Sequence, residues 1–407
     1  MAGPLQGLKV LDLSRVLAGP WASQTLADLG AEVIKIERPG AGDDTRAWGP
    51  PYAKDTSGKP TAESAYFLSA NRGKKSVTID LASTEGQAIV SALAEQSDIV
   101  IENFKAGALA KFGLDYDQLS SLNPRLIYCS ITGFGQTGPN SALPGYDFLI
   151  QGMGGLMSVS GQPDGAAGAG PMKTGVAVAD LFSGMYAATA ILAAVNRRHA
   201  TGTGDCIDIA LLDVQVAMLA NQAMNYLTTG QSSTRLGNAH PNIVPYEAFA
   251  TRDGNLILAV GNDEQFSAFC RVAGKPEFAA DPRFASNAQR VRHRAVLVPA
   301  IAAIIQQCST QHWLDVFGEA GVPCGPINNI EEVFAGKHVK VRGLLLDLPH
   351  ATAGHVPSVA CPIRYRHARP ETAAGPPALG QHTQAVLSER LGLTHSEINR
   401  LRSEGVI

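Results

Sequence analysis

The chain is organised around the segment MKTGVAVADLFSGMYAATAILAAVNRRHA (residues 172–200), which is almost wholly apolar or small from Gly175 to Val195. Its larger apolar side chains recur at helical spacing, and a helix that is apolar on nearly every side is a buried helix. A membrane span is possible by length, but the segment is rich in alanine and glycine rather than leucine and contains an aspartate. We therefore expect a central core helix that ends near the Gly-Thr-Gly of residues 202–204.

Asp180 is the one carboxylate inside this apolar stretch, near its beginning. One interpretation is a helix N-cap, because aspartate favours that position and its carboxylate satisfies free backbone N–H groups. The other is a partly desolvated nucleophile at the positive end of a buried helix. The two are compatible, because a place at the helix N-terminus also keeps the carboxylate ionised. The segment alone leaves both interpretations open.

The composition is that of a globular chain. With 407 residues, 45% of them hydrophobic and 17% charged, it is long enough for two domains or one large α/β unit. The net charge is -3 and no Lys/Arg-rich run occurs, so nucleic acid is not expected as a partner. Six dispersed cysteines without a C-x-x-C pair, and no basic segment before an apolar one at the N-terminus, favour a cytoplasmic protein without a membrane anchor.

Strand and helix patterns alternate before the apolar segment. Helical patterns at 19–29 and 85–96 lie between strand patterns at residues 8–13, 31–37, 75–81, 98–103 and 125–135. This alternation predicts a Rossmann-like α/β domain with a mostly parallel sheet, whose ligands gather at the C-terminal ends of the strands. No G-x-G-x-x-G follows the first strand, so a nicotinamide dinucleotide is not expected.

The second half of the chain predicts a smaller domain. Its composition changes at residues 231–249, which are polar and rich in turn residues. The elements predicted in this half are a strand and long helix at 206–230, a strand and helix at 255–274, helices at 295–307 and 311–320, a strand at 362–367, and helices at 383–391 and 394–403.

Motifs for serine, metal or phosphate-loop chemistry are missing. The sequence has no G-x-S-x-G, no H-E-x-x-H, no Cys/His cluster and no Walker loop. The kinds of chemistry that this sequence still allows are therefore carboxylate chemistry and anion binding. Arg46, in GDDTRAWGPP, is either a solvated loop cation or a carboxylate clamp, because a guanidinium pairs both oxygens. Alternatively it pairs with Asp43 or Asp44 and holds the shape of the loop. His240, in GNAHPN, is most simply a loop histidine, with a ligand contact as the alternative.

Many separated motifs resemble the class III coenzyme A transferases, the group of formyl-CoA transferase and carnitine CoA-transferase. These motifs are VLDLSRVLAGP, GAEVIKIERPG, NRGKKSVTIDL, ENF, GFGQTGP, VAVADLFSGMYAATAILAAV, GVPCGPINN and LGQHT. The resemblance covers essentially the whole chain. ERPGAGDDTRAWGPP and GNAHPNIVPYEAF are most similar to the branch that uses dicarboxylates, so the resemblance implies succinyl-CoA as donor and glutarate or a similar acid as acceptor.

The resemblance implies that Asp180 is the nucleophile. Its carboxylate would attack an acyl-CoA to give a mixed anhydride, and the released thiolate would then form an aspartyl-CoA thioester. The acceptor acid would reverse both steps, so coenzyme A enters as a thioester substrate, with no permanently bound cofactor and no metal. Both intermediates would hydrolyse in water, so we expect loops at 152–170 and 261–266 to cover the site.

Further site residues follow from the same resemblance. Coenzyme A contacts are implied at Val16, Arg38, Asn103, Lys111, Gly133 and Phe134, with Arg72, Lys74 and Lys75 as phosphate partners. Acid-binding residues are expected at Arg46, Tyr146, His240 and Gly261. Formyl-CoA members have glutamine at the position of Leu17 and arginine at that of Lys111. Formate or oxalate is therefore not the expected acid, and the Lys111 contact is weaker or merely electrostatic.

Two alternative functions stay open. The α-methylacyl-CoA racemases share the fold and use the histidine of a G-H-D motif with a later aspartate as acid/base groups. This chain has Gly145-Tyr146-Asp147 there, and tyrosine, with a pKa near ~10, is a poor base at neutral pH. The second alternative is a non-catalytic CoA-binding protein, against which the intact Asp180 argues.

The resemblance also implies a homodimer whose two chains interlock as rings. The domains expected from this plan are a large domain at 1–200 completed by 351–407, a small α+β domain at 231–320, and linkers at 201–230 and 321–350.

Overall fold

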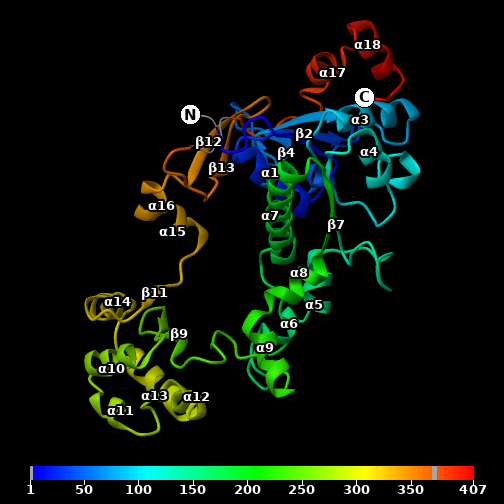
Figure 1. Ribbon diagram of the computed structural model, residues 1–407. Coiled ribbons are helices and arrows are strands. Elements are labelled where there is room, and N and C mark those ends of the chain that lie inside the picture. The colour runs from blue at the N-terminus through cyan, green and yellow to red at the C-terminus, as the bar shows by residue number, and fades with distance from the viewer. Residues whose placement is uncertain (1–2, 369–373) are drawn as a thin grey trace. The chain divides into compact units, whose positions relative to one another are not determined.

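The computed structural model describes residues 3–368 and 374–407 (Figure 1). The chain divides into two compact units. Unit 1 comprises Met1–Leu156, Thr174–Ala223 and Lys337–Ile407, and unit 2 comprises Met157–Lys173 and Met224–Gly336. These borders differ from the expected ones, because the segments foreseen as linkers belong to the compact units. Residues 201–223 contribute a strand to the main sheet of unit 1, and residues 321–336 belong to unit 2.

Unit 1 is built on a six-stranded parallel sheet with the order β5-β2-β1-β6-β7-β8. The strands are β1 (Lys9–Asp12), β2 (Glu32–Glu37), β5 (Lys74–Thr78), β6 (Ile99–Glu102), β7 (Ile127–Thr132) and β8 (Asp205–Ala210). The chain starts in the middle of the sheet, builds one half, and then builds the other half from β6 onward. The C-terminal ends of β1 and β6 therefore meet at a topological switch point, where such sheets bind ligands. This order confirms the predicted parallel α/β sheet.

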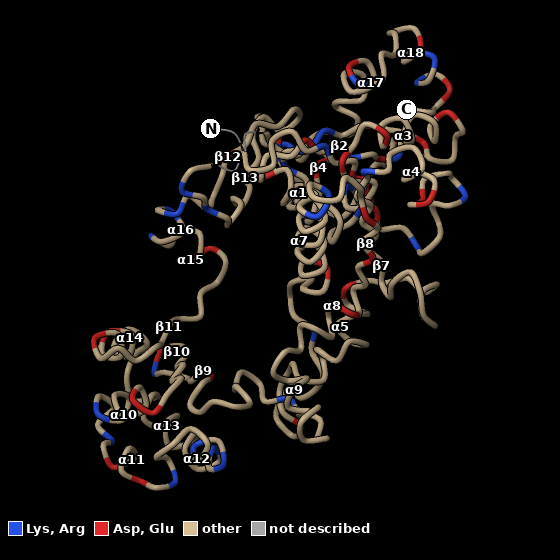
Figure 2. Tube along the Cα trace, viewed as in Figure 1, with Lys and Arg blue, Asp and Glu red and all other residues tan. Residues whose placement is uncertain are grey.

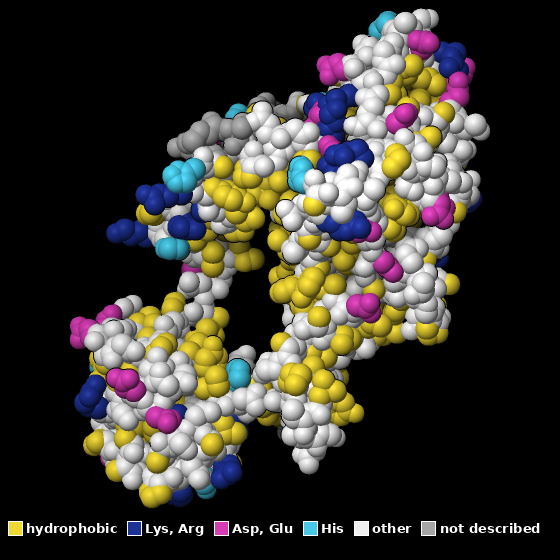
Figure 3. Space-filling model, viewed as in Figure 1, with side chains coloured by type: hydrophobic (Ala, Val, Ile, Leu, Met, Phe, Trp, Pro, Cys, Tyr) yellow, Lys and Arg dark blue, Asp and Glu magenta, His cyan; other side chains and the backbone are white. Residues whose placement is uncertain are grey.

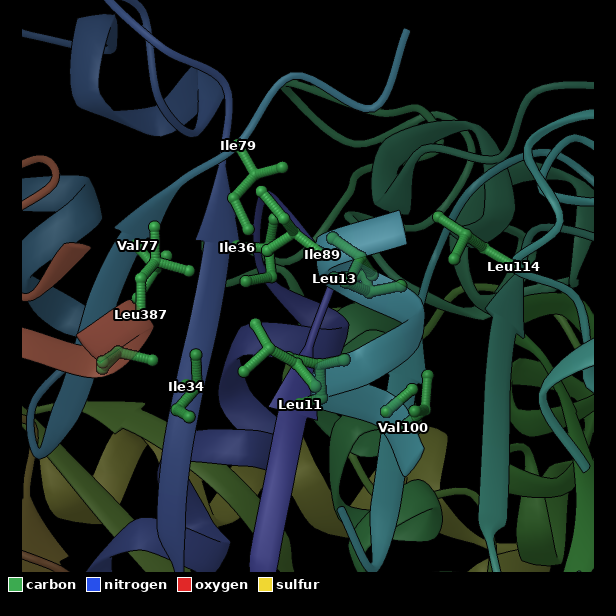
Figure 4. Close-up of a cluster of buried hydrophobic side chains, with 14 of the residues drawn as sticks. Leu11, Leu13, Ile34, Ile36, Val77, Ile79, Ile89, Val100, Leu114 and Leu387 are labelled. Atoms are coloured by element: carbon green, nitrogen blue, oxygen red, sulfur yellow. The ribbon is translucent and has the colours of Figure 1, made fainter. Parts of the chain in front are cut away.

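Alternate residues of the strands face two hydrophobic cores, as the period of two of a β-strand requires. Leu11, Ile34 and Val100 face the first core, which Figure 4 shows with Leu387 from the C-terminal part of the chain. The helices of this core are α3 (Thr84–Glu95), α4 (Tyr116–Leu122), α17 (Thr383–Leu391) and α18 (His395–Ser403). On the other face lie α1 (Ala18–Asp28), α5 (Asp147–Met153), α7 (Val178–Thr201) and α8 (Leu211–Met218).

The apolar segment forms α7, which packs against α1 and β7. Gly184 makes this packing possible, because a Cβ atom there would lie 2.6 Å from the Ala18 carbonyl oxygen. By length and composition α7 could cross a membrane. Only its inner side is buried in unit 1, however, and Phe182 and Tyr186 on its outer side are about half exposed, at 48% and 49%. The expected burial on nearly every side is therefore wrong for the single chain.

The loop after β2 and the late part of unit 1 contain structure that the sequence patterns missed. The loop holds a 3-10 helix (Asp44–Ala47), the hairpin β3 (Tyr52–Lys54) and β4 (Pro60–Ser64), and α2 (Ala65–Ser69). The late part holds α16 (Lys337–Val341) and the hairpin β12 (Leu345–His350) and β13 (Gly354–Val359). The strand predicted at 362–367 does not form, because this segment continues beyond β13 without a pairing partner.

Unit 2 contains a three-stranded antiparallel sheet covered by helices. Its sheet consists of β9 (Tyr246–Ala250), β10 (Asn255–Ala259) and β11 (Cys324–Pro326). Its helices are α10 (Asp263–Val272), α11 (Pro276–Ala280), α12 (Asn287–Arg292), α13 (Arg294–Ile305), α14 (Thr310–Glu319) and α15 (Ile330–Ala335). Phe266, Phe269 and Phe317 form the centre of its core. At the borders between units lie α6 (Leu156–Val159) and α9 (Ala220–Thr229), and the 3-10 helix Ala110–Phe112 follows β6 in unit 1.

Candidate active site

A cleft of about 410 Å³ opens at the topological switch point of unit 1. The loops that follow β1, β6 and β7 line it, as expected for the carboxyl ends of parallel strands. Of the predicted site residues, the cleft brings together Val16, Asn103, Gly133, Tyr146 and Asp180. Its wall also contains Leu17, Trp48, Phe104 and the cations Arg15 and Lys105.

Asp180 lies in the first turn of α7, but it is not the N-cap. Ala177 occupies that position, and the Asp147 carboxylate accepts a hydrogen bond from the Ala179 N–H at 2.9 Å. Asp147 therefore satisfies the helix terminus that Asp180 was expected to cap. Within residues 3–368 and 374–407, no donor forms a hydrogen bond to the Asp180 carboxylate, which is left available for chemistry.

Burial and, second, the charge of Asp147 raise the pKa of Asp180 from 3.8 to about 7. The expectation that the helix N-terminus keeps this carboxylate ionised is therefore wrong, because desolvation outweighs the helix dipole. At neutral pH roughly half of the molecules carry the ionised form. A carboxyl group with a pKa shifted this far in a cleft is typical of a functional residue.

Two glycines fix the position of Asp147. A Cβ atom on Gly133 would lie 2.5 Å from the Gly145 Cα, so both positions must lack a side chain for the two backbones to touch. This contact holds the turn after β7 against the segment that contains Tyr146 and Asp147. Asp147 in turn holds the N-terminus of α7, so the glycine contact helps to place Asp180.

Asn103 and Asp43 hold the loop after β1. The Asn103 side chain accepts from the Arg15 N–H at 2.9 Å and donates to the Arg15 carbonyl oxygen at 2.6 Å. Val16 has a positive φ of 70°, which is strained for a β-branched residue, and its N–H donates to the Asp43 carboxylate at 3.2 Å. Asp43 is buried in an ion pair with Lys35 at 2.9 Å. The loop is thus held from both sides.

A second cavity of about 400 Å³ adjoins the cleft in the same unit, and Arg15 and Phe104 line both. It contains two of the predicted coenzyme A residues, Arg38 and Lys111. Its wall is otherwise mostly apolar, with Leu13, Ile79, Leu81 and Phe112.

Four predicted coenzyme A contacts lie elsewhere. Arg72 is buried and its guanidinium pairs with Asp28, and the buried Lys74 pairs with Asp12 at 3.1 Å. Lys75 pairs with Glu32 at 2.7 Å, near the amino ends of the strands and thus at the edge of the sheet opposite the cleft. The Phe134 side chain packs in the second core. Phosphate contacts at Arg72, Lys74 and Lys75 do not fit these placements, because Arg72 and Lys74 are buried in ion pairs and Lys75 lies at the opposite edge of the sheet.

Arg46 is neither a solvated cation nor a carboxylate clamp; it holds the shape of the loop, with Glu37 and Glu63 rather than Asp43 or Asp44 as its partners. Its guanidinium is buried, donates to both Glu37 oxygens at 2.7 and 2.8 Å, and pairs with Glu63 at 3.3 Å. It also lies 3.6 Å from the centre of the Phe67 ring. A buried cation requires such neutralisation. Arg46 therefore holds the shape of the loop and is not free to clamp a substrate.

His240 and Gly261 belong to unit 2. The His240 ring lies 5.3 Å from that of Tyr246, and burial together with the Arg294 charge lowers its pKa. The Gly261 N–H donates to the Gln265 side chain at 2.7 Å. The expected covering loop at 152–170 lies mostly in the same unit.

Trp48 and Tyr66 were missed by the sequence patterns. Their rings meet edge to face at 5.1 Å, and Trp48 lines the cleft. Burial and then the charge of Asp180 raise the pKa of Tyr66 to about 12, so this phenol is neutral and lies near Asp180. The unusual length of the loop after β2 was the one available signal. Within the described ranges, no three His, Cys, Asp or Glu side chains gather to hold a metal ion.

Comparisons with known proteins agree with this geometry. The family model of CoA-transferase family III matches residues 5–383. The succinate–glutarate CoA-transferase of Agrobacterium fabrum is 51% identical over 391 residues, 95% of each chain. The mouse succinyl-CoA:glutarate CoA-transferase is 44% identical over 99% of this chain and 90% of its own. A crystal structure of a CAIB/BAIF family protein from Brucella suis has a TM-score of 0.83 and 48% identity, over 96% of this chain and all of that one. The chain belongs to CoA-transferase family III and is a CoA-transferase, as its motifs predicted.

Proposed function

We propose that this enzyme transfers coenzyme A from succinyl-CoA to glutarate or a closely similar dicarboxylate, with Asp180 as the nucleophile. The substrate assignment rests on the relatives at 51% and 44% identity, which are named for succinate or succinyl-CoA and glutarate. The nucleophile assignment rests on one observation: the Asp180 carboxylate lines the cleft without a hydrogen-bond donor among the described residues.

The proposed reaction has two stages, which mirror each other. The Asp180 carboxylate attacks the thioester carbonyl of succinyl-CoA, which gives a mixed anhydride and the coenzyme A thiolate. The thiolate attacks the aspartyl carbonyl of that anhydride, so succinate leaves and an aspartyl-CoA thioester remains. Glutarate then attacks this thioester to form a second anhydride and thiolate. Attack of the thiolate on the glutaryl carbonyl releases glutaryl-CoA and restores the carboxylate.

The two adjoining cavities suit the two ends of an acyl-CoA. Arg38 and Lys111 would bind phosphates in the second cavity, whose apolar wall would receive the adenine. The main chain around Val16, Asn103 and the Gly133-Phe134 turn would guide the pantetheine arm to Asp180. Trp48 and Tyr66 would exclude water from the reactive intermediates.

Arg15 and Lys105 replace Arg46 as proposed partners of the distal carboxylate, because they are the cations that line the cleft. The ion pair of Arg15 with Asp44, at 2.7 Å, is exposed to solvent, so the guanidinium can exchange this partner for a substrate carboxylate. Losing such a charge-assisted contact costs about 1.5–3 kcal/mol, or roughly tenfold to a hundredfold in affinity. Arg15→Gln should therefore raise KM for glutarate by that factor and leave KM for acetate unchanged. An equal effect on both acids would reject this assignment.

A homodimer is proposed because the outer face of α7 is apolar and uncovered in the single chain. Phe182, Met185 and Tyr186 are 48%, 39% and 49% exposed, and apolar side chains are visible along this part of unit 1 (Figure 3). Faces of this kind mark protein interfaces. Light scattering of the wild-type protein should give twice the mass of one chain, and Tyr186→Glu should reduce the fraction of the protein that is dimeric.

We propose a cytoplasmic location, because all six cysteines are free.

Trapping the covalent intermediate tests the mechanism. Incubation with succinyl-CoA followed by hydroxylamine should convert Asp180 to a hydroxamate, which peptide mass spectrometry would locate. Asp180→Asn should remain unlabelled under the same conditions. Continued CoA exchange without label on Asp180 would refute the nucleophile assignment, and equal rates with glutarate and acetate would refute the dicarboxylate assignment.

A further inference from the structure

A polar row crosses three neighbouring strands near the cleft. Glu102 on β6 lies beside Ser130 on β7, and Ser130 lies beside Asp208 on β8, as the strand register fixes. Glu102 and Ser130 are buried, and Asp208 is exposed. Gln136 forms hydrogen bonds to two members of this row. Its backbone N–H donates to the Asp208 carboxylate at 2.9 Å, and its side-chain amide donates to the Ser130 hydroxyl at 2.6 Å.

This row ends at the boundary between the two cavities. The Glu102 carboxyl accepts a hydrogen bond from the Phe104 N–H at 2.7 Å. Phe104 lines both the cleft and the second cavity, so a molecule that occupies both must pass over its turn. Gln136 follows the turn after β7 that also lines the cleft. The row therefore connects two loops of the site through buried side chains.

Glu102 has no cation among the groups that shift its pKa. Burial, with a smaller contribution from Asp208, raises the pKa of Glu102 to about 7 against the opposing hydrogen bonds from Ser130 and the Phe104 N–H. Tyr128 and Cys206 occupy the adjacent row of strand residues, and burial raises the pKa of both, so they are neutral at pH 7.

Cations line both of the cavities that meet at the Phe104 turn, and Arg38 and Lys111 lie in the second one. The Arg15 guanidinium lies 6.0 Å from the centre of the Phe104 ring, and Lys105 lines the same cleft. The positive charges over this turn therefore attract an anion toward a buried carboxyl that is itself close to ionisation. Figure 2 shows charges of both signs interspersed along the strands and loops of unit 1.

We propose that Glu102 is a proton-linked positioning residue for coenzyme A. When the anionic part of coenzyme A lies over the Phe104 turn, its charge opposes ionisation of Glu102, which takes up a proton from solvent. Ionisation of Glu102 at higher pH correspondingly weakens binding, since linkage acts in both directions. The inference rests on the proposed placement of coenzyme A across the two cavities.

The test measures ligand binding in the absence of catalysis. The ligand is 3′-dephospho-CoA, whose pyrophosphate does not titrate near neutral pH, and the background is Asp180→Asn, which removes the other carboxyl with a pKa near 7. Calorimetry at pH 7 in buffers of different ionisation enthalpy gives the number of protons taken up. Titrations at pH 6, 7 and 8 give the affinity. The comparison variant adds Glu102→Gln, which keeps an acceptor for the Phe104 N–H but cannot ionise.

We expect uptake of about 0.3 protons per site and a fall in affinity of roughly twofold to fivefold between pH 6 and 8, which corresponds to a pKa rise of about 0.5–1 on binding. Both effects should disappear with Glu102→Gln. A control, Asp205→Asn in the same background, removes an exposed carboxylate at the other end of β8 and should change neither. Absence of proton uptake in Asp180→Asn would overturn the inference even if the Gln variant failed to fold. Uptake that persists with Glu102→Gln would overturn it too, whereas failure of the ligand to bind at all would instead reject the proposed placement of coenzyme A.

Discussion

Replacing Asp180 by asparagine should abolish transfer and at the same time stabilise the protein above pH 7. The folded pKa of about 7 exceeds the usual value of 3.8 by roughly three units, at about 1.36 kcal/mol each, so ionised Asp180 destabilises the fold by at most ~4 kcal/mol. Partial exposure of the side chain to solvent reduces this to an expected gain of about 1–3 kcal/mol. The lost interaction with the helix dipole is smaller, at ~0.3–1 kcal/mol.

The sign of the effect sets its pH dependence. Between pH 4 and 7 the unfolded chain binds fewer protons at this position than the folded one, so wild-type stability falls as pH rises. Asparagine lacks this fall, so its advantage at pH 5 should be about two-fifths of that at pH 8, where it is nearly complete. Urea unfolding at these two pH values, at one protein concentration, measures it. Asp117→Asn is the control, since Asp117 is an exposed aspartate in the first turn of α4.

Two results would refute this reasoning. A stability difference that is the same at pH 5 and pH 8 would mean that burial does not raise the pKa of Asp180. Near-normal turnover of purified Asp180→Asn with succinyl-CoA and glutarate would mean that another group is the nucleophile. The first result bears on the electrostatics of the cleft and the second on the chemistry, so the two can be told apart.

Three further changes probe the groups around Asp180. Asp147→Asn removes the charge that helps to raise the pKa of Asp180, so the acidic limb of kcat/KM should move to lower pH; an unmoved limb would contradict the coupling. Gly145→Ala places a methyl group against the turn after β7 and should lower the free energy of unfolding in urea by about 1–3 kcal/mol and also lower kcat. Unchanged stability and kcat would show that the methyl group is accommodated freely. Arg46→Ala leaves Glu37 buried without its partner and should cost about 3–5 kcal/mol; selective loss of dicarboxylate transfer without loss of stability would restore the clamp role.

The order of strands and helices in unit 1 could be predicted because each element carries its own period. β1, α1, β2, β5, α3, β6 and β7 all lie within a few residues of their predicted positions. The hairpin β12–β13 was missed because antiparallel pairing depends on a partner strand and not on local pattern. The exposed outer side of α7 was missed for a related reason, since hydrophobicity indicates burial without saying which surface covers it.

The positions of site residues could be predicted where a motif fixes the backbone. They were predicted less well where a side chain has several possible partners for hydrogen bonds or ion pairs. Val16, Asn103 and Gly133 gather in one cleft because they follow strands of a single sheet, and the N-terminus of α7 brings Asp180 to the same place. For Arg46, sequence indicates a cation near carboxylates but cannot decide that Glu37, on β2, is the one it meets. The resemblance to a family narrowed these choices only for residues inside its motifs.

The order of synthesis has a consequence for unit 1. α17 packs beside β5, where its residue Thr383 bonds to Thr78 at 3.0 Å, and Leu387 fills the first core. About 160 residues, including nearly all of unit 2, separate Ala223 from Thr383. At ~5–20 residues per second, a ribosome needs roughly 8–32 s to make them. For that time the first core has α3 and α4 but lacks α17 and α18, so part of its apolar surface around Val77 is uncovered. The emerging chain should therefore depend on chaperones that bind apolar β-surfaces until its last helices arrive.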